Sequence, residues 1–243
     1  MNKKKILILC GDMLKHKYFA IKILKTFPNS GIIFEKYPKD TSSNYTKVSS
    51  KIINEHFNQV IETDKSYFFD YVKNNEEFLS SKILIEVEKG HINDDETIKY
   101  INDFGPALIV INATSIIKNK LLELYPRKII NLHAGLCQFY RGAGCNVWPF
   151  YFNELEYVGM TVHFVDEGID TGEILLQSRP KFQVIDNTHS IGCKNVFIGV
   201  KLVKNVIKEY FSKGSLSGYS QKKHKVSRLC LKKAFTQEII ICI

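Results

Sequence analysis

Short apolar runs alternate with helical stretches along the first half of the chain. The runs are apolar on successive residues, which is typical of strands that helices cover on both faces. They lie at 5–10, 31–37, 82–87, 107–113 and 128–133. The stretches between them predict helices at about 14–26, 48–62, 66–79, 94–103 and 118–125. This alternation predicts an α/β fold of the Rossmann type, a mostly parallel sheet with flanking helices.

The pattern changes after residue 145. Residues 158–166 and 172–182 are predicted to form neighbouring strands that the turn EGIDTG joins. Apolar side chains at helical spacing predict a helix over about 189–212. We expect the last 25 residues to form a small hairpin or a dimer element. The chain thus divides into a catalytic core, 1–187, and a C-terminal helix with a small extension, 188–243.

Composition narrows the class of protein. The chain has 243 residues, and no apolar stretch approaches the roughly 20 residues that span a bilayer. The basic start MNKKK precedes an apolar run too short for a signal peptide. Six cysteines without a Cys-x-x-Cys pair fit neither a zinc site nor a disulfide framework. We therefore expect a cytoplasmic protein with no membrane partner.

The positive charge is concentrated at one end of the chain. The net charge is +9, and residues 201–243 hold 10 Lys or Arg against two Glu, so 10 − 2 = +8 lies there. A solvated helix face followed by a tail is the interpretation we favour over a polyanion site. A basic RNA-binding module on an inactive scaffold stays open as a rival, although the segment has few aromatic residues for base stacking.

Polar residues end the strand predicted at 128–133. Asn131 and His133 are two residues apart, so their side chains leave the strand on the same face. Ligands of parallel sheets bind at the carboxyl ends of strands. An amide there can donate to an oxyanion, and an imidazole can move a proton near neutral pH. A single Asn-x-His is nevertheless more often structural than catalytic.

The turn VDEGIDTG (165–172) is a second candidate. Its glycines, Gly168 and Gly172, permit close approach of a ligand to the backbone, and Asp170 lies between them. Carboxylates in such turns more often satisfy local backbone amides. Neither element identifies a site alone.

Three motifs, taken in order, resemble those of the folate-dependent formyltransferases: Asn-x-His, a Tyr-Arg-Gly loop and His-Phe-x-x-x-x-x-Asp-x-Gly. The resemblance is good over about residues 80–185 and loose elsewhere. The resemblance implies 10-formyltetrahydrofolate as formyl donor and no metal. It implies that Asn131 donates to the oxyanion, that His133 moves the proton and that Asp170 orients His133. It also implies a folate pocket formed mainly by backbone atoms at Ser115, Ile116, Ile117, Lys118 and at 165–170, including Val165, Asp166 and Gly168. Ile116 and Ile117 have an equally good interpretation as core residues at a helix start.

Some positions depart from the family pattern. Many relatives have Pro where this chain has Gln138, and some have Pro-Ser or Ala-Ser where it has Ala134-Gly135. These departures put the geometry of the loop in question, and they do not affect the three polar residues. His163 is expected to be a strand residue packed near the site.

The acceptor is inferred from what the sequence lacks. The segment CGDMLKHKYF has no Gly- and Ser-rich phosphate loop, which disfavours glycinamide ribonucleotide. Only some sixty residues follow the catalytic region, which disfavours methionyl-tRNA. We expect a sugar-nucleotide N-formyltransferase of the 4-amino-4,6-dideoxy type, with dTDP-4-amino-4,6-dideoxyglucose as acceptor for a bacterial surface polysaccharide such as the O-antigen of lipopolysaccharide. Transfer to either disfavoured acceptor stays open.

Candidate contacts for the sugar nucleotide follow the first strand and the Tyr-Arg pair. They are Lys15, His16, Lys17, Tyr18 and Arg141. Tyr18, Tyr37 or Phe69 can stack on a base, although core packing is the favoured interpretation for these three rings. The ending TQEIIICI is expected to be a strand that contacts a second copy in a homodimer.

Overall fold

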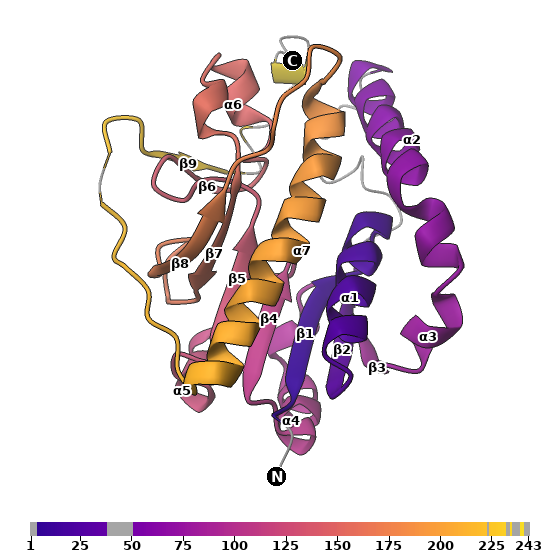
Figure 1. The fold of residues 1–243 in the computed structure, drawn as a ribbon, viewed down its shortest axis with the longest axis vertical. Coiled ribbons are helices and arrows are strands. Elements are labelled where there is room, and N and C mark those ends of the chain that lie inside the picture. Colours follow the sequence, from indigo (N-terminus) through magenta and orange to yellow (C-terminus); the bar gives the residue numbers. More distant parts are fainter. Residues whose placement is uncertain (1–3, 38–50, 223, 232–233, 235–238, 241–243) are drawn as a thin grey trace.

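The structure is a computed structural model that describes residues 4–37, 51–222, 224–231, 234 and 239–240. A central sheet lies between helices on its two faces (Figure 1). The strands are β1 (Ile6–Gly11), β2 (Ser30–Lys36), β3 (Ile83–Glu88), β4 (Leu108–Asn112), β5 (Ile129–His133), β6 (Tyr140–Gly142), β7 (Met160–Phe164), β8 (Ile174–Ser178) and β9 (Arg228–Cys230). The helices are α1 (Leu14–Thr26), α2 (Lys51–Lys73), α3 (Glu76–Ser80), α4 (Asp95–Phe104), α5 (Asn119–Leu124), α6 (Trp148–Tyr151) and α7 (Thr188–Lys213), with 3-10 turns η2 (His91–Asn93) and η3 (Leu155–Tyr157).

The main sheet has seven strands in the order β3-β2-β1-β4-β5-β7-β8. The first five are parallel, whereas β7 and β8 pair antiparallel with their neighbours. The order reverses between β1 and β4, and in open α/β sheets ligands bind at the carboxyl ends of strands near such a reversal. A second, two-stranded sheet pairs β6 with β9. The fold class is thereby confirmed.

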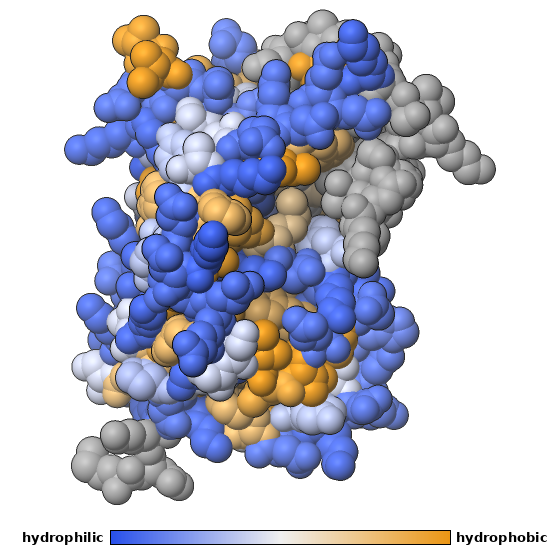
Figure 2. Space-filling view, turned by 90° about the vertical axis from the view of Figure 1, so that its right-hand side faces the viewer, coloured by the Kyte–Doolittle hydropathy of each residue, from blue (hydrophilic) through white to orange (hydrophobic). Residues whose placement is uncertain are grey.

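Two apolar cores explain why the strands are apolar on successive residues. One face of the sheet packs against α1 and α7, and the other packs against α4 and α5. All six residues of β1 are buried, so neither face of that strand reaches water. The face formed by α2, α3 and β3 is mostly hydrophilic, with apolar patches between the polar groups (Figure 2).

One helix prediction is wrong. The predicted pair 48–62 and 66–79 is, within the described residues, a single helix of 23 residues, α2, followed by the short α3; residues 48–50 lie outside the described part. The predicted break at 63–65 contains neither Gly nor Pro. Its central residue, Asp64, is buried and forms an ion pair with Lys15. The ion pair of buried Asp64 with half-buried Lys15 on α1 thus favours continuation of the helix.

The C-terminal extension also differs from expectation. Among the described residues it forms no hairpin; instead β9 pairs in parallel with β6, and Tyr219 bridges to Ile174 on β8. Of the predicted strand TQEIIICI the structure describes only Ile239 and Ile240, which are helical. Ile239 packs into a small apolar cluster with Trp148. This part of the segment is therefore buried within the chain itself.

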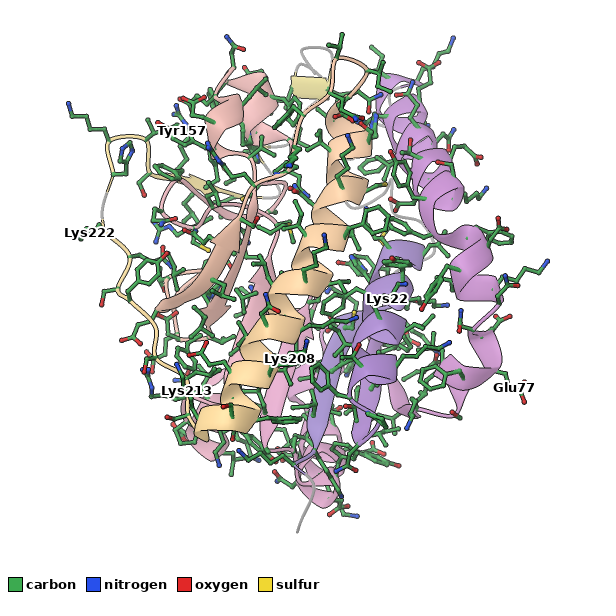
Figure 3. The ribbon with its side chains drawn as sticks, in the orientation of Figure 1. Lys22, Glu77, Tyr157, Lys208, Lys213 and Lys222 are labelled. Carbon is green, nitrogen blue, oxygen red and sulfur yellow. The ribbon has the colours of Figure 1, made fainter. Side chains whose placement is uncertain are left out.

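None of the helices within the described residues is both long and apolar enough to cross a membrane. The longest, α7, has 26 residues and presents Lys208 and Lys213 on its outward-facing side (Figure 3). These lysines agree with the interpretation of a solvated basic helix face.

Candidate active site

Four polar side chains of β5, β7 and the loop after β7 meet at one end of the sheet. Asn131 and His133 end β5, and His163 lies directly opposite Asn131 in the antiparallel pairing of β5 with β7. Asp170 follows in the loop before β8, with a positive φ of 52°. Aspartate tolerates this left-handed conformation better than most residues. The geometry brings all three predicted catalytic residues together.

Asp170 is the centre of this cluster. Its Oδ1 accepts from Asn131 Nδ2 at 3.1 Å and lies 3.3 Å from His163 Nε2. Its Oδ2 accepts from the Gly142 N–H at 2.8 Å and lies 3.2 Å from His133 Nδ1. Burial opposes ionisation of this carboxyl, but His133, His163 and the Gly142 N–H together hold the pKa of Asp170 well below its usual range. Asp170 is thus a carboxylate at neutral pH.

His133 lies between two oxygens. Its Nδ1 faces Asp170, and its Nε2 is 3.0 Å from the carbonyl oxygen of Tyr140. Burial lowers the pKa of His133, and the charge of Asp170 opposes this shift. The ring is therefore neutral near pH 7, yet each ring nitrogen has an acceptor oxygen ready once the ring gains a proton. The two oxygens can therefore stabilise the imidazolium form of His133.

Gly135, one of the departures from the family pattern, has a steric reason here. A Cβ at this position would lie 2.6 Å from His133 Nε2 and 2.8 Å from the Cβ of Cys145. The loop after β5 therefore passes so close to the imidazole that any larger residue has to displace it. Glycine at this position is therefore explained by the close packing of the loop against His133 and Cys145.

His163 has more contacts than the sequence indicates. Its Nδ1 lies 2.7 Å from the carbonyl oxygen of Phe164, and its Nε2 lies 3.1 Å from Asn131 Nδ2 and 3.3 Å from Asp170 Oδ1. The Asn131 amide thus lies within hydrogen-bond distance of both Asp170 and His163. The prediction that His163 packs near the site is confirmed, but its role as a partner of Asn131 was missed. The available signal was its place as the first residue of the His-Phe-x-x-x-x-x-Asp-x-Gly pattern.

A second group of contacts shapes the loop after β4. Glu35 ends β2, is fully buried, and accepts from Lys89 Nζ at 2.7 Å, the Gly90 N–H at 2.9 Å and the Ser115 N–H at 2.6 Å. Asn93 accepts from the Lys118 N–H at 2.8 Å and donates to the carbonyl of Ile116 at 2.9 Å. Two remote side chains therefore hold the backbone of 115–118 in one conformation.

The apolar residues of this loop separate into two roles. Ile117 is buried in the core on the α4 and α5 side, as the core interpretation predicts. Ile116 is 64% exposed beside the fixed backbone.

The other predicted folate segment, 165–170, turns at Asp166, whose Oδ1 accepts from the Gly168 N–H at 3.2 Å and from Thr171 Oγ1 at 2.7 Å. The N–H of Val165 donates to the carbonyl of Ile129 at 3.0 Å.

The candidates at the start of α1 do not behave alike. Lys15 pairs with Asp64 at 3.1 Å, and Lys17 is half-buried. Burial, with Lys15 and Lys89 nearby, lowers the pKa of His16 to about 3, so His16 has no charge to offer a diphosphate. The Tyr18 ring packs against other aromatic rings, which agrees with the core interpretation and leaves no open face for a base; these are Phe68, Tyr71 and Phe197.

The remaining candidates lie nearer the polar cluster or on the surface. Arg141 is on β6 beside Gly142, and its buried Nε has no hydrogen-bond partner among the described residues. Tyr37 is half-buried and donates its hydroxyl to the carbonyl of Ala113 at 3.1 Å. Phe69 is 46% exposed on α2. Of these, Arg141 has the clearest unused capacity to bind an acceptor oxygen.

Comparisons with known proteins agree with this geometry. A family model described as formyl transferase matches residues 40–205, more than half of the chain. The chain therefore belongs to the formyl transferase family. Methionyl-tRNA formyltransferase of Thermodesulfovibrio yellowstonii is 34% identical over 117 residues, 48% of this chain and 38% of that protein. GDP-perosamine N-formyltransferase of Brucella melitensis is 30% identical over 116 residues, 47% of this chain and 44% of that protein.

The solved structures show the same fold. An N-formyltransferase of Helicobacter canadensis, in complex with folinic acid and dTDP-3-aminofucose, aligns with a TM-score of 0.59 at 18% identity. The alignment covers 100% of this chain and 80% of that one. The curated relatives are longer: this chain spans about two fifths of their length.

Proposed function

We propose that this protein transfers a formyl group from 10-formyltetrahydrofolate to the amine of a nucleotide-linked amino sugar. The observation that carries the proposal is that Asn131 and His133 lie 3.1 and 3.2 Å from the half-buried carboxylate of Asp170. Family membership supports formyl transfer as the reaction. The donor, the acceptor and the roles of the three residues are the proposed part.

The proposed step balances without a further reactant. The amine nitrogen of the acceptor attacks the formyl carbon, the bond from that carbon to N10 of the folate breaks, and one proton moves from the amine to N10. In between, the formyl oxygen carries negative charge, and Asn131 Nδ2 donates a hydrogen bond to it. Neutral His133 takes the amine proton and returns it to N10. The carboxylate of Asp170 stabilises the imidazolium in between.

The folate is proposed to lie against the backbone at 115–118 and 165–168. Glu35 and Asn93 hold the first of these segments, so its free carbonyl and N–H groups are fixed before a ligand arrives. Preorganised backbone groups lose little entropy on binding. Ile116, exposed beside them, offers an apolar contact to a ring system.

The acceptor is proposed to be a nucleotide-linked 4-amino-4,6-dideoxy sugar, with dTDP-4-amino-4,6-dideoxyglucose the first to test. Arg141, next to Gly142 and its bond to Asp170, can meet the diphosphate, and Lys15 and Lys17 can add positive charge. Two relatives support nucleotide-linked amino sugars as the acceptor class: one acts on GDP-perosamine by its name, and one was solved with dTDP-3-aminofucose. A role in O-antigen or lipopolysaccharide synthesis, a cytoplasmic location and a homodimer belong to the same proposal.

Methionyl-tRNA is a second candidate acceptor. The matched relatives include methionyl-tRNA formyltransferases, and residues 201–243 carry the charge of +8. Positive charge attracts any nucleic acid irrespective of sequence. A direct comparison of acceptors is therefore required.

The test is incubation of the protein with 10-formyltetrahydrofolate and, in separate reactions, dTDP-, UDP- and GDP-linked amino sugars or methionyl-tRNA. Mass spectrometry then detects the gain of one formyl group. His133→Ala and Asp170→Asn are expected to abolish the gain. His91→Ala, whose ring is 60% exposed, is the matched control and is expected to retain it. Formylation of tRNA alone would overturn the sugar acceptor, and no formylation with any acceptor would overturn the proposed function.

A further inference from the structure

The segment after α7 returns to the polar cluster. We define the C-terminal strap as residues 219–222 and 224–230. In Figure 1 it runs from the end of α7 along the outer side of β8 to reach β6. We propose that the strap holds Asp170 in place and that Gln221 is a positioning residue for the reaction. This inference rests on the proposed function of Asp170.

The first contact is on the main chain of Asp170 itself. Nε2 of Gln221 donates to the carbonyl oxygens of Asp170 and Gly172, each at 2.8 Å. The two carbonyls belong to the first and the last residue of the turn at 170–172. The first of them, Asp170, has the positive φ of 52°. Such a conformation is less favourable than the common ones and persists where the surroundings fix it. Gln221 supplies two bonds that favour it.

The opposite side of this turn is also closed. A Cβ at Gly172 would lie 1.8 Å from the carbonyl oxygen of Phe164, so the turn passes directly against the end of β7. The main chain at 170–172 therefore lies between β7 and the amide of Gln221. It has no direction in which to relax while Gln221 is bonded.

The second contact reaches the carboxylate through β6. Gly142 pairs with Cys230 on β9, and the Ala143 N–H donates to the carbonyl of Cys230 at 2.8 Å. A Cβ at Gly142 would lie 2.2 Å from that carbonyl. The N–H of Gly142, held in this way, donates to Asp170 Oδ2 at 2.8 Å.

The strap is anchored on both sides of Gln221. Tyr219 exchanges backbone hydrogen bonds with Ile174 at 2.9 and 3.0 Å. Arg228 donates its backbone N–H to the carbonyl of Phe139 at 2.8 Å and pairs with Glu154 at 2.8 Å. Gln221 therefore presents its amide from a fixed stretch of chain, which is what a positioning group requires.

Loss of the Gln221 amide has a defined consequence for His133. Without the two bonds the turn relaxes, and the distance between the Asp170 carboxylate and Nδ1 of His133 increases. The charge of Asp170 raises the pKa of His133 in the intact cluster. The pKa of His133 therefore falls when Asp170 retreats, and proton transfer slows. Substrate affinity changes little, because neither substrate contacts Gln221 in the proposed function.

The experiment compares Gln221→Glu and Gln221→Ala with Lys222→Ala. Glutamate has the same size as glutamine but, when ionised, has no N–H to donate. Lys222 is the next residue, exposed at the outer margin of the molecule (Figure 3), and serves as the control. The readouts are the NMR titration of the His133 ring and, on the acceptor that the wild type formylates, kcat and both KM values.

For both Gln221 variants we expect a lower pKa of His133 and a kcat reduced by about 10- to 100-fold, with KM values within about twofold. Lys222→Ala is expected to match the wild type. An unchanged His133 titration in a folded Gln221 variant overturns the inference. If Gln221→Glu fails to fold, Gln221→Ala decides. Because the titration needs no substrate, it tests the strap even where the wild type formylates nothing, a result that would overturn only the proposed function.

Discussion

The cluster around Asp170 and the loop at 115–118 lie at the same end of the sheet but use side chains in opposite ways. In the cluster, the side chains themselves face the proposed place of reaction, and Asn131 and His133 each contact Asp170. In the loop, Glu35 and Asn93 are fully occupied in holding backbone groups, so the backbone is what a ligand meets. The comparison separates residues that perform chemistry from residues that shape a surface.

The two regions are therefore expected to fail differently. Replacement of a cluster residue removes a reacting group and leaves binding nearly intact. Replacement of a residue that shapes the loop alters affinity and folding stability and leaves the chemical step nearly intact. Measurements of kcat, folate affinity and folding stability on variants of the two regions test this difference.

The largest effect is expected in the cluster. His133→Ala is expected to lower kcat by about 10²–10⁴-fold, because proton transfer loses its carrier. Asn131→Ala is expected to lower it by about 10²–10³-fold, because an oxyanion donor is lost. The binding constant for tetrahydrofolate, measured by calorimetry, is expected to stay within about threefold for both. A variant that keeps a tenth of the wild-type kcat would contradict the assigned roles.

A smaller effect is expected from the loop. Glu35→Ala removes the acceptor of three donors and is expected to lower the free energy of unfolding by about 2–3 kcal/mol. Folate affinity is expected to fall about tenfold or more, with kcat at saturating folate within about threefold of the wild type. Urea titration and calorimetry measure the two quantities.

Glu86→Gln is the control for the Glu35 variant. Glu86 lies on the neighbouring strand β3 and forms a surface ion pair with Lys36. Surface pairs contribute about 0–1 kcal/mol, so little change is expected in either quantity. Equal effects of the two substitutions would remove the distinction between the buried and the exposed carboxylate.

The smallest effect is in pH dependence. Burial lowers the pKa of His133 below the usual range of a histidine, and the group is needed in its neutral form to accept the amine proton. The rate is therefore expected to hold through neutral pH and to decline only at lower pH, as the ring becomes protonated. Folate affinity is expected to lack this decline, because backbone groups at 115–118 do not titrate. A rate that halves at or above pH 7 would argue against a neutral, buried His133 as the proton acceptor.

Much of the fold was predictable because strands covered on both faces are apolar on every residue. The strands at 128–133 and 107–113 are examples, since β5 and β4 lie within these ranges. The continuity of α2 across the predicted break at 63–65 was not predictable, because the ion pair of Asp64 with Lys15 stabilises α2 from a different helix, α1. The route of the C-terminal segment was missed for the same reason. Its partner, β6, lies more than eighty residues earlier.

The catalytic candidates were recognisable because their chemistry is carried by their own side chains in a short, ordered pattern. The sequence by itself therefore determined the α/β class and the identities of Asn131, His133 and Asp170. Tertiary structure alone decided what orients them. His163 faces Asn131 across a strand pair, Glu35 holds Ser115 over a separation of 80 residues, and Gln221 holds Asp170 over 51. In the sequence, Glu35 and Gln221 resemble any other glutamate or glutamine of the chain. What distinguishes them is a partner that only folding brings within hydrogen-bond distance.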